Sequence, residues 1–118
     1  MSGFGGVPDI PYKSGAQTIT TGGRLTLGHP FGVRPSRVQF WLECIVADVG
    51  FSVGDFYGPV PPRLIISANN EGFGQWSDAA NINVEFGADS ILLKISDKAG
   101  VRQNLTTASW KMHVEARK

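Results

Sequence analysis

The sequence predicts an all-β protein, an antiparallel β-sandwich of about six to eight strands preceded by an extended arm rich in glycine and proline. Two observations predict this fold class. The 118 residues include 15 Gly and 7 Pro, set between short stretches in which apolar and polar residues alternate. No window of about a dozen residues without a helix breaker has apolar side chains at helical spacing, so we expect almost no helix.

The arm is expected to comprise residues 1–13, and residues 14–118 form the sandwich domain. Glycine and proline interrupt the arm too often for a regular element. Apolar side chains are nevertheless spaced along it, at Phe4, Val7, Ile10 and Tyr12. A purely solvated arm does not need such side chains, so we expect it to lie on a neighbouring subunit and to anchor an assembly.

The first strands follow the arm. AQTIT and GRLTL flank the turn at residues 21–23, which predicts a tight hairpin. RVQFWLECIV, residues 37–46, carries the strongest strand pattern in the chain. One face of this strand is expected to be core: Val38, Phe40, Leu42, Cys44 and Val46. Trp41 and Ile45, on the other face, predict that another subunit partly covers it.

The later strands show the same alternation. RLIIS, a glycine-rich strand with Phe73 and Trp76, NINVEFG and SILLKIS follow one another, and residues 87–89 predict a hairpin between the last two. In the final strand, SWKMHVEARK, the inward positions are Trp110, Met112, Val114 and Ala116. Two sheets packed face to face bury such strands, with a closed barrel as the alternative.

Composition narrows the functional classes. The 11 Lys and Arg nearly balance the 10 Asp and Glu, and no basic block predicts a nucleic-acid partner. The single cysteine, Cys44, excludes an internal disulfide and is expected to be a buried small hydrophobe. His29 and His113 are too far apart in sequence to suggest a metal site, and we expect no cofactor. Neither a secretory signal nor a membrane-spanning run is evident, so synthesis in the cytoplasm is expected.

GFSVG, residues 50–54, matches the nucleophile elbow G-x-S-x-G of serine hydrolases, and acidic residues and His113 follow Ser52 in the hydrolase order. The elbow requires a helix after the turn. The next residues, DFYGPVPPR, contain three prolines that forbid one. We therefore expect no enzyme, with Phe51 and Val53 pointing inward and Ser52 outward. Carboxylates in or near loops are expected to form turns: Asp48, Asp55, Glu71 and Asp78.

Aromatic and amide side chains gather in two loops and suggest a binding surface. The expected contacts are Asp55, Phe56 and Tyr57 in one loop and Asn69, Asn70 and Trp76 in the other. Aromatic faces can stack on the C–H faces of a sugar while polar groups bond its hydroxyls. The same residues suit a protein partner, so both interpretations stay open.

Four blocks together resemble small β-proteins encoded among the tail, fibre and spike genes of tailed bacteriophages and phage-like gene transfer agents. The blocks, within residues 14–118, are SGAQTITTGGRLTLGHPFGVRPSRVQFWLEC, GFSVGD, NINVEFG and TTASWKMHVEARK. The resemblance implies a non-enzymatic tail-fibre, spike or tail-tip protein of the virion. It also implies a homo-oligomer that contacts other virion proteins and host-surface glycans.

The closing pattern of Trp110, Val114 and Ala116 is also similar to the H-type lectin sandwich, which forms trimers and binds sugars between subunits. This similarity of architecture implies a homotrimer and glycan binding by analogy. Two alternatives remain. One is a capsid decoration or adaptor protein without a host ligand, and the other is a small polysaccharide depolymerase or esterase.

Overall fold

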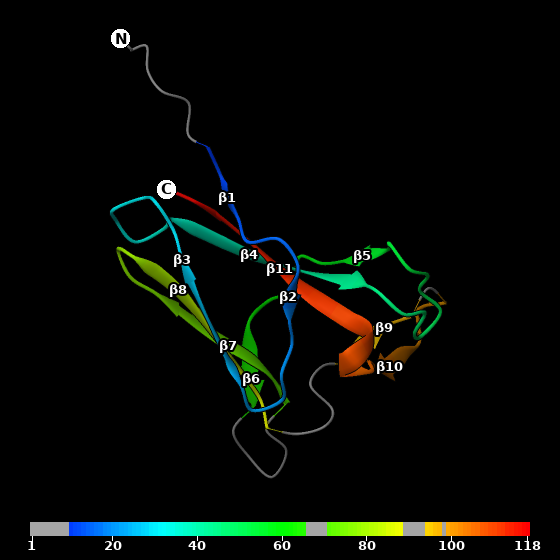
Figure 1. The fold of residues 1–118 in the computed structure, drawn as a ribbon. Coiled ribbons are helices and arrows are strands. Elements are labelled where there is room, and N and C mark those ends of the chain that lie inside the picture. Colours follow the sequence, from blue (N-terminus) through cyan, green and yellow to red (C-terminus); the bar gives the residue numbers. More distant parts are fainter. Residues whose placement is uncertain (1–9, 66–70, 89–93, 98) are drawn as a thin grey trace.

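A computed structural model describes residues 10–65, 71–88, 94–97 and 99–118, and it confirms the all-β class (Figure 1). The described residues contain one short 3₁₀ turn, η1, and no α-helix. The strands are β1 (Tyr12–Lys13), β2 (Gln17–Thr18), β3 (Arg24–Gly28), β4 (Arg37–Cys44), β5 (Phe56–Tyr57), β6 (Arg63–Ile65), β7 (Glu71–Ser77), β8 (Asn81–Phe86), β9 (Lys94–Ser96), β10 (Arg102–Asn104) and β11 (Trp110–Arg117), with η1 at Thr107–Ser109.

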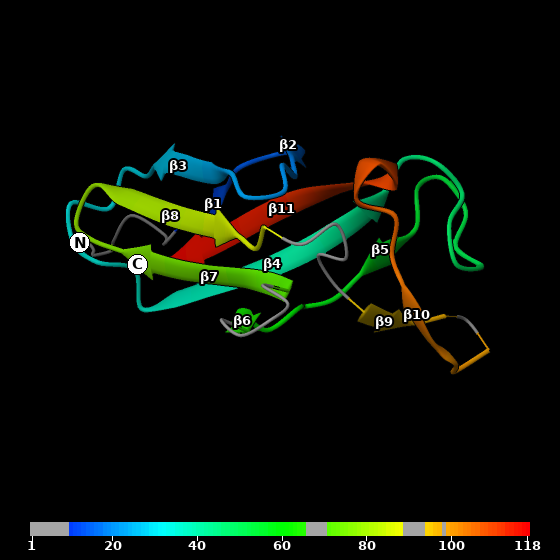
Figure 2. The ribbon, with the colours of Figure 1, turned by 90° about the horizontal axis from the view of Figure 1, so that it is seen from below.

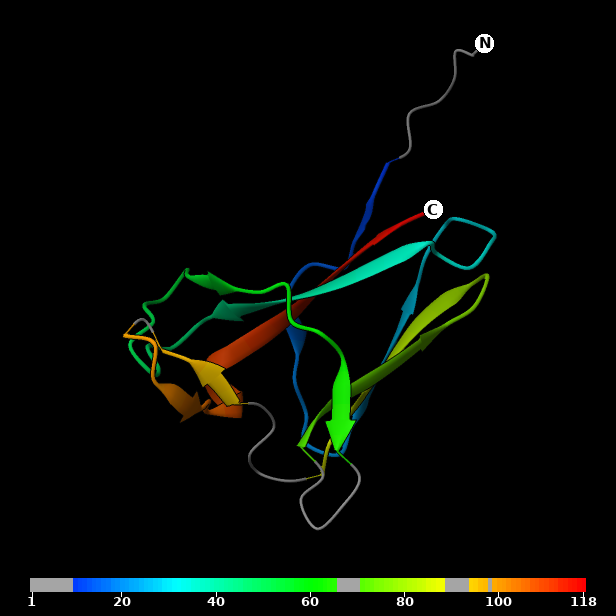
Figure 3. The same cartoon turned by 180° about the vertical axis from the view of Figure 1, so that it is seen from behind.

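These strands form three antiparallel sheets. The first has the order β1–β11–β4–β5, with β2 also paired to β11, and the second has the order β3–β8–β7–β6. The third is the β9–β10 hairpin. β4 and β11 pair along their full length, from Cys44 opposite Trp110 to Arg37 opposite Arg117. Figure 3 shows β6 at the edge of the second sheet, away from the β4–β11 pair that forms the centre of the first.

The core lies between the two larger sheets. Their inward side chains form one buried cluster, which includes Phe40 and Leu42 of β4, Met112 and Val114 of β11, Phe73 of β7, and Ile82, Val84 and Phe86 of β8. Phe40 meets Phe73 edge to face, with ring centroids 4.9 Å apart, and joins the sheets directly. In Figure 2, β7 and β8 run beside β4 and β11. The alternation predicted the inward positions of β4, β8 and β11, with the exception of Val46, which lies beyond β4 and is exposed.

Both predicted hairpins are wrong as strand pairings. The turn after Thr20 exists, since Gly23 N donates to Thr20 O over 2.8 Å, but β2 then pairs with β11 and β3 with β8. Likewise β8 pairs with β3 and β7, while β9 pairs with β10. The chain thus changes sheet between β2 and β3 and again between β8 and β9. Alternation reveals which face of a strand is buried, but it does not reveal the strand's partner.

The eleven strands of the described residues exceed the expected six to eight, because the shortest ones are too brief to show alternation.

The predicted arm, residues 1–13, includes strand β1. Tyr12 lies opposite Ala116 and packs against the core, so Tyr12 and Lys13 belong to the sheet. Ile10, just before β1, is 72% exposed. Phe4 and Val7 lie outside the described residues.

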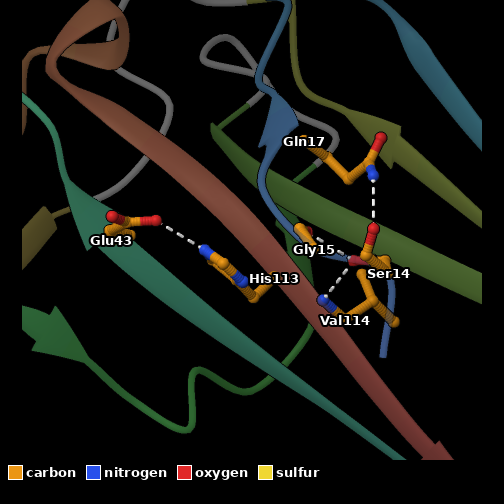
Figure 4. A network of polar contacts seen from close by, with 6 residues as sticks. All are labelled: Ser14, Gly15, Gln17, Glu43, His113 and Val114. Carbon is orange, nitrogen blue, oxygen red and sulfur yellow. Dashed lines mark hydrogen bonds and ion pairs between the residues drawn. The ribbon is translucent and has the colours of Figure 1, made fainter. Parts of the chain in front are cut away.

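Ser14 fastens the segment between β1 and β2 to β11. Its N–H donates to Val114 O, and its Oγ accepts from Val114 N, each over 2.9 Å. Gln17 Nε2 donates to Ser14 O over 2.9 Å, as Figure 4 shows. The N-terminal edge of the first sheet is thereby held in place as far as residue 18. None of the described helical residues forms a segment long and apolar enough to cross a membrane.

Candidate functional site

The outer face of the second sheet brings together side chains from three strands. The register places Arg24, Glu85 and Gly74 in one row and Thr26, Asn83 and Trp76 in the next. Their neighbours Phe73, Val84 and Ile82 are buried in the core, so these six residues point outward. Trp76 is 50% exposed and is the one apolar side chain of the six. We call this surface the Trp76 face.

Hydrogen bonds order the polar groups of the Trp76 face. Thr26 Oγ1 donates to Asn83 Oδ1 over 3.0 Å, and Asn83 is only 4% exposed. In the other row, Arg24 Nη2 lies 2.8 Å from Glu85 Oε1, and both side chains are exposed. A shallow hollow of about 450 Å³ adjoins this ion pair, lined by Gly22, Gly23, Arg24, Glu85 and Phe86. The indole thus stands beside hydrogen-bonding groups, and the outer pair of these groups lines an open recess.

The other predicted contacts, Asp55, Phe56 and Tyr57, do not form one surface. Phe56 lies opposite Glu43 and points outward, whereas Tyr57 lies opposite the buried Leu42 and points toward the core. Tyr57 packs edge to face on Phe51 with ring centroids 5.8 Å apart. Adjacent residues of a strand face opposite ways, which separates these two rings. Phe56 and Tyr57 thus lie on opposite sides of the sheet, and their contact with a ligand stays a prediction.

Phe56 is 53% exposed but has close neighbours on the first sheet. Its ring centroid lies 5.1 Å from that of His113. His113 Nε2 in turn lies 2.7 Å from Glu43 Oε1, across the β4–β11 pair (Figure 4). His113 is half-buried and is joined to the neighbouring strand.

The two aromatic sites lie at opposite ends of the molecule. In Figures 1 and 2, β5 lies at one end, and the C-terminal end of β7, which carries Trp76, lies at the other. Phe56 and Trp76 therefore belong to separate surfaces. Asn69 and Asn70, predicted to accompany Trp76, lie outside the described residues.

GFSVG forms a turn rather than a nucleophile elbow. Asp48 and Phe51 pair across Val49 and Gly50, whose φ angles of 43° and 84° are those of a two-residue hairpin turn. Ser52 N then donates to Asp55 Oδ2 over 2.9 Å, and strand β5 follows where the elbow would require a helix. Phe51 packs against the core as predicted. Val53 does not: it is 68% exposed, so its predicted inward position is wrong.

Asp48 holds this loop to the last strand. Its Oδ2 accepts from Thr106 N over 2.7 Å and from Trp110 Nε1 over 3.0 Å, and its Oδ1 accepts from Thr106 Oγ1 over 3.1 Å. Burial alone would raise the pKa of Asp48, but these bonds outweigh it and hold the pKa below its usual value. The carboxylate has a structural role, which the sequence did not distinguish from that of the other loop acids.

Two further reactive groups have structural roles. Asp78 Oδ1 accepts from the backbone N–H of Ala80 and Asn81, which closes the β7–β8 turn and lowers the pKa of Asp78. Cys44 is fully buried, as predicted, and burial raises the pKa of its thiol. Across the part of the chain that the structure describes, no three His, Cys, Asp or Glu side chains are grouped so as to hold a metal ion.

No protein-family model, curated protein or solved structure matches this chain. The sequence singled out Trp76 but missed the other members of its face. Alternation in RLTLG and NINVEF could have placed Arg24, Thr26, Asn83 and Glu85 outward. It could not have shown that these two strands lie side by side and next to β7, because their pairing is set by tertiary packing.

Proposed function

We propose that the protein is a non-enzymatic component of a phage or phage-like particle, a tail-fibre, spike or tail-tip protein, that binds host-surface glycans through the Trp76 face. The exposure of Trp76 on an otherwise polar sheet face carries this proposal. An indole offers a flat apolar surface for the C–H groups of a sugar. Arg24 and Glu85, in the neighbouring row, offer exposed donors and acceptors for the hydroxyls.

The proposed architecture is a β-sandwich made of the two larger sheets, supported by the core that their inward faces share. The proposed particle protein is a homotrimer that binds other virion proteins through its N-terminal arm and needs no cofactor. Ile10, exposed at the start of the sheet, supports an arm contact outside the subunit. Weak glycan sites repeated around a trimer gain effective affinity without new contacts.

A glycan array tests the proposal directly. Wild-type protein should bind host-surface glycans, and Trp76→Ala should not, because the stacking surface is removed. Phe56→Ala is the matched control: Phe56 is an aromatic residue of similar exposure at the other end of the molecule, so this variant should bind as the wild type does. Absence of glycan binding, together with a tight contact to a capsid or tail-tube protein, would support the adaptor alternative instead.

Deleting residues 1–10 tests the arm separately. The deletion leaves Tyr12 and Lys13 paired with β11, so the thermal unfolding of the subunit should change little. The solution mass should fall from that of an oligomer to that of a monomer. A truncated protein that keeps the mass of the wild-type oligomer would contradict the proposed role of the arm.

A further inference from the structure

We infer that the Trp76 face contains two adjoining subsites and that its ligand is a neutral oligosaccharide with vicinal hydroxyls. This inference rests on the proposed glycan-binding function and specifies its ligand class. One subsite is the row of Trp76, Asn83 and Thr26, and the other is the row of Gly74, Glu85 and Arg24.

The spacing of the rows suits consecutive sugar units. Trp76 and Gly74 are two residues apart on one strand, as are Asn83 and Glu85, so the rows are separated by about 7 Å. This separation is comparable with the length of one sugar ring. A ring stacked on Trp76 would therefore place its linked neighbour over the Glu85 row.

Gly74 leaves the second row open. It occupies an outward position beside Glu85, where any other residue would place a side chain. On the opposite flank, the hollow of about 450 Å³ reaches the same ion pair between Gly22, Gly23 and Phe86. This volume is within the range of small-ligand sites, about 300–1,000 Å³. The Arg24 and Glu85 side chains are themselves 58% and 43% exposed, so a ligand can reach the pair.

The chemistry of the pair matches a diol. Arg24 engages Glu85 through Nη2 and keeps further N–H donors, and Glu85 keeps acceptor positions on its carboxylate. One hydroxyl of a vicinal pair can donate to the carboxylate while the other accepts from the guanidinium. A sugar carboxylate in the hydroxyl position beside Glu85 would instead face a like charge, which disfavours uronic and sialic acids in this pose.

Calorimetric titration with defined saccharides tests the two subsites. Maltose, cellobiose and lactose are compared with methyl glucoside and methyl galactoside and with cellobiouronic acid. The best neutral disaccharide should bind the wild type about ten-fold more tightly than its methyl monosaccharide, and also more tightly than the acidic disaccharide. Gly74→Val, which fills the second row, and Glu85→Gln should each remove this ten-fold gain.

Trp76→Ala should lose both kinds of ligand, and thermal unfolding identifies any variant that fails to fold. If Trp76→Ala abolishes binding but Gly74→Val and Glu85→Gln leave disaccharide affinity unchanged, the second subsite is wrong and the glycan site stands. If the acidic disaccharide binds as tightly as the best neutral one, or more tightly, the ligand is not a neutral saccharide, but the two subsites stand. If no saccharide binds, or Trp76→Ala has no effect, the proposed function fails as well.

Discussion

Two aromatic side chains, Phe56 and Trp76, are exposed to almost the same extent at opposite ends of the molecule, yet their surroundings differ. Phe56 packs on His113, which is joined to Glu43, so it completes a cluster within its own sheet. Within the described parts of the chain, the Trp76 side chain has no ring contact and no hydrogen bond. The fractional exposure of an aromatic side chain alone does not identify a binding residue.

The outer face of the first sheet is also closely packed at Trp41. Gly58, with φ of 144°, passes beside its indole, and a Cβ built on Gly58 would lie 3.1 Å from Trp41 Cε3. The sheet face around Phe56 is therefore filled by the protein's own packing. On the Trp76 face, by contrast, the indole remains half exposed and its neighbour in the next row is a glycine, Gly74.

Gly58→Ala should have the largest effect on stability. The new Cβ would lie 3.0 Å from Phe40 O, and the φ angle strains any residue other than glycine. We expect a loss of about 3 kcal/mol, since a strained φ and overpacking each cost about 1–3 kcal/mol. Gly54→Ala is the control, because Gly54 has φ of 95° but open space around it. Urea unfolding compares the two, and equal losses would show that Trp41 is not tightly packed here.

Asp48→Ala should cost about 2 kcal/mol at pH 7, because the buried Trp110 Nε1 loses its acceptor. The pKa of Asp48 is lower in the folded state than in the unfolded chain, so its stabilisation is complete above about pH 4. It is lost as the pH falls through the folded-state pKa. The difference in free energy of unfolding between wild type and variant should therefore shrink below pH 4. A difference that grows in acid would contradict the assigned role.

The smallest expected effects on the free energy of unfolding distinguish the Phe56 site from the Trp76 site. Phe56 and His113 should show a coupling free energy of about 0.5–1 kcal/mol in a double-mutant cycle, because their rings are in contact. Trp76→Ala should change the free energy of unfolding by no more than about 0.5 kcal/mol, as for a surface side chain outside the core. A loss of several kcal/mol at Trp76 would identify it as a structural residue and weaken the proposed binding face.

The sequence predicted the buried faces of the long strands and little of their pairing. Phe40, Leu42, Met112 and Val114 are inward because alternation over eight residues specifies a face. β2 and β5 have two residues each, which is too short for such a signal. The turns gave no indication that the chain changes sheet, because sheet exchange depends on how the two apolar faces meet in the folded protein.

The candidate site was predictable only in part for the same reason. A tryptophan in a glycine-rich strand suggested Trp76, but Arg24, Asn83 and Glu85 join it through pairings that span most of the chain. Phe56 and Tyr57 seemed equivalent as neighbours in a loop. Their incorporation in a strand sends them to opposite faces.

The most direct test of the central claim uses the three indole N–H signals of the protein in a two-dimensional proton–nitrogen NMR spectrum. Trp76→Phe assigns one signal by its disappearance. On titration with a glycan that binds the wild-type protein on the array, that signal should shift, and the signals of Trp41 and the buried Trp110 should stay in place. A shift confined to Trp41, or binding that leaves the Trp76 signal unmoved, would contradict the assignment of the Trp76 face as the glycan site.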